Sequence, residues 1–369
     1  MMHMILKHKD HFHGSDLEKI EKIYGIRREE ITSYSANVNP LGISPEAAAA
    51  IASHLHCIES YPDREYAALK QSIADYAGCD TAQILVGNGT TELISHVIAT
   101  TMPKKALILG PTYSEYEHSV SVCGGSSVYF PLQEKDGFAL RVEALTEKLT
   151  DDTDLLVICN PNNPTGTCIG ISDMRRILNC CMEHGIFVMV DETYIEFVAD
   201  LKSVSAVPLA NDYNNLVVLR GVSKFFAAPG LRLGYAVTGN ANLLSKITAN
   251  ADPWTINSFA ELAGTVMFGD KDYIEKTRSL IATERDRMYQ LFSDSARFKA
   301  YAPSANFMLL RIQEEGLSAQ TLFEACIREK MMIRDCSTFP FLDEHYIRFC
   351  FLMPAQNDLL AAKLLSEAL

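Results

Sequence analysis

Short apolar runs alternate with longer segments of helical pattern along the central part of the chain. Four apolar runs, at 106–109, 155–159, 186–190 and 216–220, predict strands. The segment 172–184, between the second run and the third, has the spacing of apolar residues that is typical of a helix. This alternation predicts an α/β fold with a mostly parallel sheet sandwiched by helices.

The pattern changes from about Asp270 onward. Two helical patterns, at 273–292 and 358–369, flank short strand candidates such as 307–311 and 346–350. These elements predict a smaller α+β domain behind the larger α/β domain.

Two domains follow from this change of pattern. We expect a large cofactor-binding domain over 45–265 and a small domain over 266–369. The N-terminal segment 1–44 is expected to join the small domain as an arm, or to reach across to a partner subunit.

A different kind of side chain follows each of the four central strands. Tyr113 follows the first, Asn163 the second, Asp191 the third and Lys224 the fourth. Ligands bind open α/β sheets at the carboxyl ends of the strands. The sequence therefore predicts that an aromatic ring, an amide, a carboxylate and an amine meet at one edge of the sheet.

These four groups match the needs of one cofactor, pyridoxal 5′-phosphate (PLP). PLP requires an amine for its aldehyde, a carboxylate for its pyridine nitrogen, donors for its O3′ atom, an anion site for its phosphate and a flat surface against its ring. Lys224 lies among apolar neighbours, so desolvation would lower its pKa and favour imine chemistry. Asp191 ends a predicted buried strand, where its carboxylate needs a partner such as a pyridinium N–H. Taken singly, each residue also fits an ordinary role, such as a loop lysine or a helix N-cap.

The turn 87–92 supplies a candidate phosphate site. It follows an apolar run at 84–86 and leads directly into a helical pattern. Free N–H groups at a helix N-terminus bind anions. The hydroxyl of Ser223 and the fixed charge of Arg232 would complete the site.

Composition narrows the class of protein. The chain has 369 residues, of which 48% are hydrophobic and 21% charged, as in a soluble globular protein, and its formal net charge is −13. Such a surface repels nucleic acid and anionic membranes, so we expect neither as a partner. The charge also argues against a PLP-binding regulator without turnover, which would carry a DNA-binding module.

The cysteines and the N-terminus bear on the compartment. Ten cysteines are scattered without a CxxC motif or a His/Cys cluster. We therefore expect free thiols in a reducing compartment and no metal site. The N-terminal residues lack the sustained apolar run of a signal peptide, and no stretch of about 18 apolar residues occurs elsewhere. These features predict a cytoplasmic protein.

Several short motifs, in this order and spacing, resemble those of one family. They are YPD at 61–63, GNGTTE at 87–92, NPNNPTG at 160–166, DETY at 191–194, SKFFAAPGLRLGY at 223–235 and the arginine at 348. The chain resembles the fold-type I PLP enzymes of the class I/II aminotransferase group along nearly its whole length. The resemblance implies an aminotransferase-like fold and a homodimer.

The resemblance also implies roles for the residues of the cofactor site. The catalytic residues would be Lys224, which binds PLP as a Schiff base, Asp191 at the pyridine nitrogen, and Tyr113, which stacks on the ring. The further PLP contacts would be Asn163 and Tyr194 at O3′, Ser223, Arg232 and the amides of Gly89 and Thr90 at the phosphate, and Tyr61 from the other subunit.

Within this family the chain resembles two groups. The segments 13–14, 35–42, 253–257 and 333–336 resemble the threonine-phosphate decarboxylases of cobalamin biosynthesis, which convert L-threonine O-3-phosphate to (R)-1-aminopropan-2-yl phosphate. By that resemblance the phosphorylated amino acid would contact His13, Gly14, Asn37, Asn163, Arg334 and Arg348. The alternative is a histidinol-phosphate aminotransferase, because the same PLP contacts serve both reactions.

Overall fold

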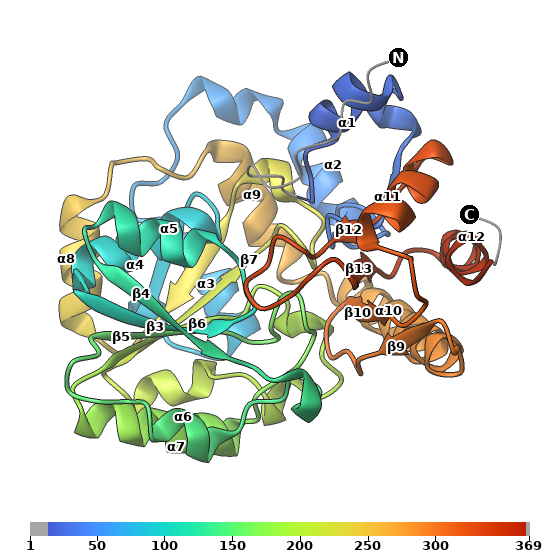
Figure 1. Cartoon of the computed structure of the whole chain (residues 1–369). Helices are drawn as coiled ribbons and strands as arrows, with labels where there is room; N and C mark the ends of the chain where they lie inside the picture. Colours follow the sequence, from blue (N-terminus) through green and yellow to red (C-terminus); the bar gives the residue numbers. More distant parts are fainter. Residues whose placement is uncertain (1–13, 367–369) are drawn as a thin grey trace.

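The computed structural model describes residues 14–366, and its largest sheet has seven strands (Figure 1). The four predicted apolar runs lie in this sheet, where nearly every residue of each run is buried. In spatial order the strands are β2 (Ile84–Gly87), β8 (Gly234–Val237), β7 (Leu216–Gly221), β6 (Phe187–Asp191), β5 (Leu155–Cys159), β3 (Lys105–Gly110) and β4 (Ser126–Pro131).

One strand of this sheet runs against the others. β8 pairs antiparallel with both β2 and β7, and the remaining pairs are parallel. The predicted, mostly parallel sheet is therefore confirmed. Because β8 opposes both of its neighbours, β2 points the same way as β7. The carboxyl ends of β2, β3, β5, β6 and β7 thus lie at one edge of the sheet.

Helices cover both faces of the sheet (Figure 1). On one face, α4 (Thr90–Thr101), α5 (Glu115–Val122) and α8 (Ala241–Asn250) pack over inward-facing residues such as Ile108. On the other face, α6 (Val142–Thr146) and α7 (Ile171–Glu183) pack over residues such as Leu107. Alternate residues of a strand enter opposite cores, as expected for a sheet that is covered on both sides. A further layer contains α2 (Pro45–Ser53), α3 (Ala67–Ala77) and α9 (Ser258–Met267).

The C-terminal part contains a four-stranded antiparallel sheet with the order β12 (Arg334–Asp335), β13 (Tyr346–Cys350), β10 (Phe307–Ile312) and β9 (Phe298–Ala300). Three helices accompany it, α10 (Lys271–Ser293), α11 (Ala319–Arg328) and α12 (Pro354–Leu365). The predicted strands and the first predicted helix are confirmed.

The limits predicted for the last helix, 358–369, are wrong. It begins earlier, at Pro354, because proline is well suited to the first turn of a helix, and it ends at Leu365.

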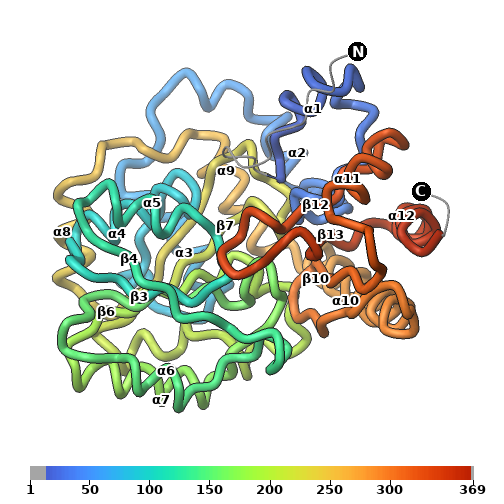
Figure 2. Tube along the Cα trace, in the orientation of Figure 1, coloured from blue at the N-terminus to red at the C-terminus, as the bar shows by residue number. Residues whose placement is uncertain are grey.

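The N-terminal segment lies against this C-terminal part (Figure 2). After α1 (Leu17–Tyr24), strand β1 (Thr32–Ser33) pairs in parallel with β11 (Met331–Met332). The hydroxyl of Tyr34 donates to the carbonyl of Gln356 at 2.6 Å. Further along, the N–H of Asn39 donates to the carbonyl of Lys224 at 3.0 Å. The segment therefore joins the C-terminal part to the carboxyl edge of the large sheet.

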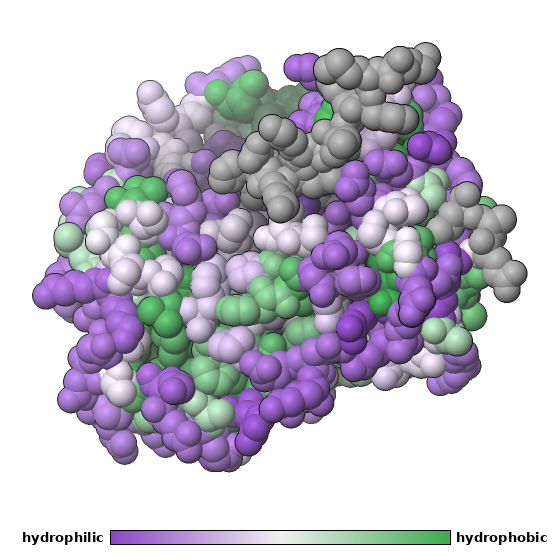
Figure 3. Space-filling view, in the orientation of Figure 1, coloured by the Kyte–Doolittle hydropathy of each residue, from purple (hydrophilic) through white to green (hydrophobic). Residues whose placement is uncertain are grey.

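Hydrophilic residues cover most of the surface that Figure 3 shows, and hydrophobic residues gather over the β4 edge of the large sheet. Val128 of β4 is 45% exposed. All ten cysteines are free thiols, as predicted. No helix in the described part of the chain is long and apolar enough to cross a membrane.

Candidate active site

Lys224 lies just beyond the carboxyl end of β7. Its ammonium group donates to the backbone carbonyl of Ala36 at 2.7 Å. Burial lowers the pKa of Lys224 to about 8, and the positive charge of Arg348 acts in the same direction. A larger fraction of this amine is neutral near pH 7 than of an ordinary lysine, which makes it a better nucleophile for an aldehyde.

Asp191 is the last residue of β6, and its carboxylate is buried. Its Oδ2 atom accepts a hydrogen bond from the hydroxyl of Tyr116 at 2.6 Å. Its Oδ1 atom accepts from the backbone N–H of Thr193 at 2.9 Å and from the Thr193 hydroxyl at 2.6 Å. Burial raises the pKa of Asp191, and the donors from Thr193 and Tyr116 oppose this increase.

A hydrogen-bonded cluster brings together residues that the sequence predicts for the cofactor and for the substrate. Arg348 donates through Nη1 to Oδ1 of Asn163 and through Nη2 to the carbonyl of Ser35, the latter at 2.7 Å. Nearby, Nδ2 of Asn37 donates to the hydroxyl of Tyr194 at 3.3 Å. All of these side chains are buried. The cofactor side and the substrate side of the expected site are therefore directly connected.

Phe307 of β10 contacts both halves of this cluster and was not among the predicted site residues. Its ring centroid lies 5.3 Å from the guanidinium carbon of Arg348 and 4.9 Å from the ring centroid of Tyr194. A cation over an aromatic face is stabilised by the ring quadrupole. Phe307 belongs to an ordinary apolar strand, so its pattern could not distinguish it from a core residue.

Arg334 stands directly opposite Arg348 in the register of β12 and β13, and both side chains are buried. Arg334 donates to the hydroxyl of Thr338 at 2.9 Å, and its guanidinium carbon lies 5.4 Å from the ring centroid of Phe339. Burial lowers the pKa of Arg334, and the charge of Arg348 adds to this effect. Like charges at opposed strand positions repel each other. The pair therefore favours an anionic ligand between or beside the two groups.

The turn after β2 forms a narrow anion site. Gly89 caps the N-terminus of α4 with a φ of +84°, and a Cβ atom there would overlap Nη2 of Arg232. This Nη2 atom donates to the carbonyl of Asn88 at 3.4 Å. A Cβ atom on Gly234 would lie 2.8 Å from the backbone nitrogen of Thr90. The two glycines let a guanidinium group and the first amides of α4 approach one position, which suits a phosphate.

Tyr113 and Ser223 also lie at the carboxyl edge, and both are partly buried. The ring of Tyr113 packs edge-on against Tyr116, with centroids 5.7 Å apart and planes at 86°. Burial raises the pKa of Tyr113 to about 12. Ser223 directly precedes Lys224 in the chain.

The predicted residues near the N-terminus have different outcomes. A Cβ atom on Gly14 would lie 2.5 Å from the carbonyl oxygen of Ser35, so Gly14 packs closely on the group that binds Arg348. His13 lies outside the described residues. Tyr61 is 77% exposed and stacks on Trp254, with ring centroids 4.5 Å apart. The expected contact of Tyr61 with a second subunit stays a prediction.

Tyr116 and Thr193 bind Asp191 but were not among the predicted site residues. Tyr116 lies three residues after Tyr113 in the chain, and a buried tyrosine hydroxyl requires a partner. Thr193 lies two residues after Asp191, a spacing at which Asp side chains often bond local groups. These signals point to a hydrogen bond, but they do not identify the partner of Tyr116.

The residues present fit PLP. The edge offers an amine, a buried carboxylate, an aromatic ring and an anion site. Buried polar groups are normally hydrogen-bonded, yet several atoms in this region have no partner among the described residues. They are Oγ of Ser35, Oδ1 of Asn37, Oγ1 of Thr112, Oδ1 of Asn162, Oδ1 of Asn306 and Nε of Arg348. These atoms mark the place of a polar ligand.

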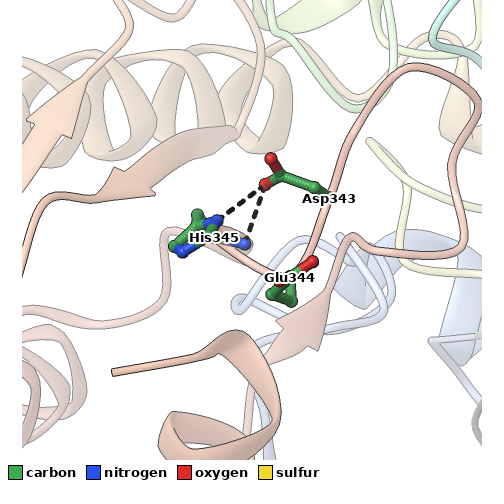
Figure 4. Close-up of side chains that lie close together, drawn as sticks. All are labelled: Asp343, Glu344 and His345. Atoms are coloured by element: carbon green, nitrogen blue, oxygen red, sulfur yellow. Dashed lines mark hydrogen bonds and ion pairs between the residues drawn. The ribbon is translucent and has the colours of Figure 1, made fainter. Parts of the chain in front are cut away.

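A separate group of possible metal ligands lies in the loop before β13. One ligand atom from each of Asp343, Glu344 and His345 lies within 4.8 Å of the others. Figure 4 shows Asp343 and His345 bonded to each other. Oδ1 of Asp343 accepts from the backbone N–H of His345 at 2.9 Å and pairs with its Nδ1 at 3.2 Å. These bonds form a local turn with exposed carboxylates, and we assign no metal to it.

Comparisons with known proteins identify relatives of nearly the whole chain. The family described as "Aminotransferase class I and II" matches residues 29–364. The threonine-phosphate decarboxylase of Salmonella typhimurium is 33% identical over 352 residues, which cover 95% of each chain.

Solved structures identify relatives of both reaction types. The histidinol-phosphate aminotransferase from Clostridium acetobutylicum has a TM-score of 0.84 at 34% identity, over 90% of this chain and 97% of that chain. The L-threonine-O-3-phosphate decarboxylase from Porphyromonas gingivalis has a TM-score of 0.79 at 26% identity, with the same coverage of 90% and 97%. These similarities confirm the predicted aminotransferase-like fold.

Proposed function

The chain belongs to the class I and II aminotransferase family of PLP-dependent enzymes, and within this family we propose that it decarboxylates L-threonine O-3-phosphate to (R)-1-aminopropan-2-yl phosphate. The buried pair of Arg334 and Arg348, opposed in the strand register, carries this proposal. The substrate has a phosphate at one end and a carboxylate at the other, which supplies one anion for each guanidinium group. The resemblance to the decarboxylases supports a role for this reaction in cobalamin biosynthesis.

The cofactor would be held by the residues at the carboxyl edge of the large sheet. Lys224 would bind its aldehyde, Asp191 its pyridine nitrogen and Tyr113 its ring. Its O3′ atom would contact Asn163 and Tyr194, and its phosphate Ser223, Arg232, Gly89 and Thr90. When bound, PLP supplies an electron sink for the electrons of a bond that breaks at Cα of the substrate.

The protein would select which bond at Cα breaks by anchoring the two anionic ends of the substrate. Arg348 of β13 is hydrogen-bonded to Asn163, and Arg334 lies opposite Arg348 on the neighbouring strand β12. Two anchors fix the rotation of the substrate about Cα, which a single anchor does not. The bond from Cα to the carboxylate breaks and CO₂ leaves. Lys224, with its lowered pKa, is the group that would return a proton to Cα.

Histidinol-phosphate aminotransferase is the second candidate, favoured by the 34% identity to the Clostridium acetobutylicum enzyme. Histidinol phosphate has a phosphate but no carboxylate. Its single anionic group would bind one arginine of the pair and leave the other without an anion. The amino acceptor 2-oxoglutarate has two carboxylates and would suit both arginines. The paired charges therefore favour L-threonine O-3-phosphate over histidinol phosphate as the amino substrate.

A direct comparison of the two reactions tests the proposal. The purified holoenzyme is incubated with L-threonine O-3-phosphate, and CO₂ and the amino alcohol phosphate are measured. In parallel it is incubated with histidinol phosphate and 2-oxoglutarate, and glutamate is measured. We expect CO₂ release from the first substrate to be the faster reaction by at least about a hundredfold, the discrimination that two additional charge-assisted hydrogen bonds supply. Formation of glutamate without CO₂ release would overturn the decarboxylase assignment.

We further propose a cytoplasmic homodimer with domains at 45–265 and at 1–44 with 266–369. Exposed apolar side chains support the dimer. Leu55, Ile58 and Tyr61 are 58%, 64% and 77% exposed, and Trp254, which stacks on Tyr61, is 40% exposed. Such a group of exposed hydrophobic residues is typical of a protein interface. Burial of this group would bring Tyr61 towards a second subunit.

A further inference from the structure

Tyr116, like Thr193, is hydrogen-bonded to Asp191 but has no role among the proposed cofactor contacts. It lies on α5, and its hydroxyl donates to Oδ2 of Asp191 at 2.6 Å. Both side chains are buried, so water does not compete for this bond. The ring of Tyr116 packs edge-on against Tyr113, which fixes the direction of the hydroxyl. The hydrogen bond from Tyr116 to Asp191 is therefore short and shielded from water, and the packing of Tyr116 against Tyr113 orients it.

The position of one proton explains why such a donor matters. If Asp191 pairs with the pyridine nitrogen of PLP, the two groups share a proton, and the more basic group holds it. A carboxylate that already accepts hydrogen bonds is less basic than one that accepts none. Tyr116 on Oδ2 and Thr193 on Oδ1 both lower the basicity of Asp191. They therefore shift the shared proton towards the nitrogen.

We propose that Tyr116 is a positioning residue that keeps Asp191 ionised and oriented, so that the pyridine nitrogen of bound PLP stays protonated. This inference rests on the proposed pairing of Asp191 with that nitrogen. It does not depend on whether the enzyme decarboxylates or transaminates its substrate, because both reactions need a protonated ring. Tyr116 acts through Asp191 and is not itself a contact of the substrate.

A simpler explanation is that the Tyr116 hydroxyl only satisfies its own need for a partner in a buried place. Removal of the hydroxyl would then change the stability of the protein but not the protonation of the cofactor. A measurement that reports the proton on the pyridine nitrogen separates the two explanations.

The experiment uses Tyr116→Phe, which removes the hydroxyl and keeps the ring. The apo-protein is reconstituted with PLP labelled with ¹⁵N at the ring nitrogen, and the ¹⁵N resonance and the dissociation constant of PLP are measured. We expect the resonance to move towards that of unprotonated pyridine and the dissociation constant to increase about tenfold, the effect of one hydrogen bond to a charged group. An unchanged resonance, even with weaker binding, would overturn the inference.

Tyr129→Phe is the matched control. The hydroxyl of Tyr129 also donates to a carboxylate, Oε2 of Glu117, at 2.9 Å, but that pair is outside the predicted cofactor contacts. We expect neither the ¹⁵N resonance nor the affinity for PLP to change in this variant. A change as large as that of Tyr116→Phe would show that any such tyrosine has the effect, and the inference would fail.

Two further variants keep the test decisive. Thr193→Val removes the second hydroxyl donor to Asp191 and should move the resonance in the same direction, even if Tyr116→Phe does not fold. Asp191→Asn removes the carboxylate and should give the largest movement. If Asp191→Asn leaves the resonance unchanged, the pairing on which the inference rests is wrong. If Asp191→Asn moves the ¹⁵N resonance but Tyr116→Phe and Thr193→Val do not, Asp191 pairs with the ring nitrogen and the proposed role of Tyr116 is refuted.

Discussion

Lys224 and Arg348 donate hydrogen bonds to consecutive backbone carbonyls, those of Ala36 and Ser35. Neither cation forms an ion pair with a carboxylate within residues 14–366. The carbonyl dipoles of one N-terminal turn thus hold two positive charges in a buried region. Such an arrangement is unfavourable for the protein alone and favourable for the binding of anions.

The first prediction concerns the effect of Lys224 on the free energy of unfolding of the apo-protein. The pKa of Lys224 is about 8 in the folded chain and 10.5 for an ordinary lysine, so the folded state loses stability as the pH falls from 10.5 to 8 and keeps this deficit below pH 8. Lys224→Met should therefore stabilise the apo-protein by about 1–3 kcal/mol at pH 7 and by much less at pH 10.5. Urea unfolding at both pH values measures this. Lys246→Met, on an exposed position of α8, is the control for the loss of one lysine charge.

The second prediction concerns Glu196, which is buried behind the site and has no hydrogen-bond partner for Oε2 among the described residues. Burial raises the pKa of Glu196 from 4.5 to about 7, although Arg220 opposes this shift. The folded state therefore favours the protonated form, and its stability falls as the pH rises from 4.5 through 7. Glu196→Gln should stabilise the protein by about 1–3 kcal/mol more at pH 8 than at pH 4.5.

Glu192→Gln is the contrasting variant for this test. Glu192 is ion-paired with Arg220 at 2.8 Å, and both side chains are almost fully buried. Its loss should destabilise the protein by about 3–5 kcal/mol near neutral pH, since it leaves a buried guanidinium group without its charge partner. Chemical unfolding across this pH range compares the two variants. If Glu196→Gln instead destabilises the protein as Glu192→Gln does, the carboxylate of Glu196 stabilises the folded chain and the prediction is wrong.

The third prediction concerns the phosphate site. Gly89→Ala would place a methyl group against Nη2 of Arg232 and should weaken PLP binding at least about tenfold, since it displaces a charge-assisted donor. Gly124→Ala is the control, because Gly124 also has a positive φ, +80°, but nothing lies within 4 Å of its Cβ position. Both variants should lose about 1 kcal/mol of stability from backbone strain. Equal PLP affinities in the two variants would contradict the assigned phosphate site.

The fourth prediction concerns the proposed dimer. Tyr61→Glu places a charge in the apolar group around Trp254, so it should convert a dimer into monomers and weaken PLP binding. Sedimentation equilibrium measures the mass of each variant. Leu359→Glu, which changes an apolar residue on α12 that is 65% exposed, should remain a dimer. A wild-type protein that sediments as a monomer at micromolar concentration would refute the dimer.

The strand ends could be predicted from the sequence because one rule places them. The carboxyl ends of parallel strands lie at one edge of a sheet. Residues that follow buried apolar runs, such as Asp191 and Lys224, therefore lie at that edge. The antiparallel strand β8 was not predicted, yet it does not disturb the rule because β2 reverses again beside it.

Other parts of the site depend on contacts that no local pattern records. Tyr116 and Asp191 are 75 residues apart, and no local pattern around Tyr116 shows what it contacts. The carbonyls of Ser35 and Ala36 bind Arg348 and Lys224 as backbone groups, which carry no signature in the side chains. The partner of Tyr61 would belong to a second chain, so neither the sequence nor a single subunit displays it.

The pairing between the two ends of the chain has a consequence for its synthesis. Arg348 and its acceptor at Ser35 are 313 residues apart, and Tyr34 and Gln356 are 322 residues apart. A ribosome releases the sheet that bears Lys224 before it releases β13, and the contacts between distant segments form only once both segments are present. Translation therefore produces Lys224 before it produces the C-terminal segments that surround it. A nascent chain shorter than about 350 residues would lack part of β13 and with it part of the proposed site, so we expect no activity before β13 has been synthesised.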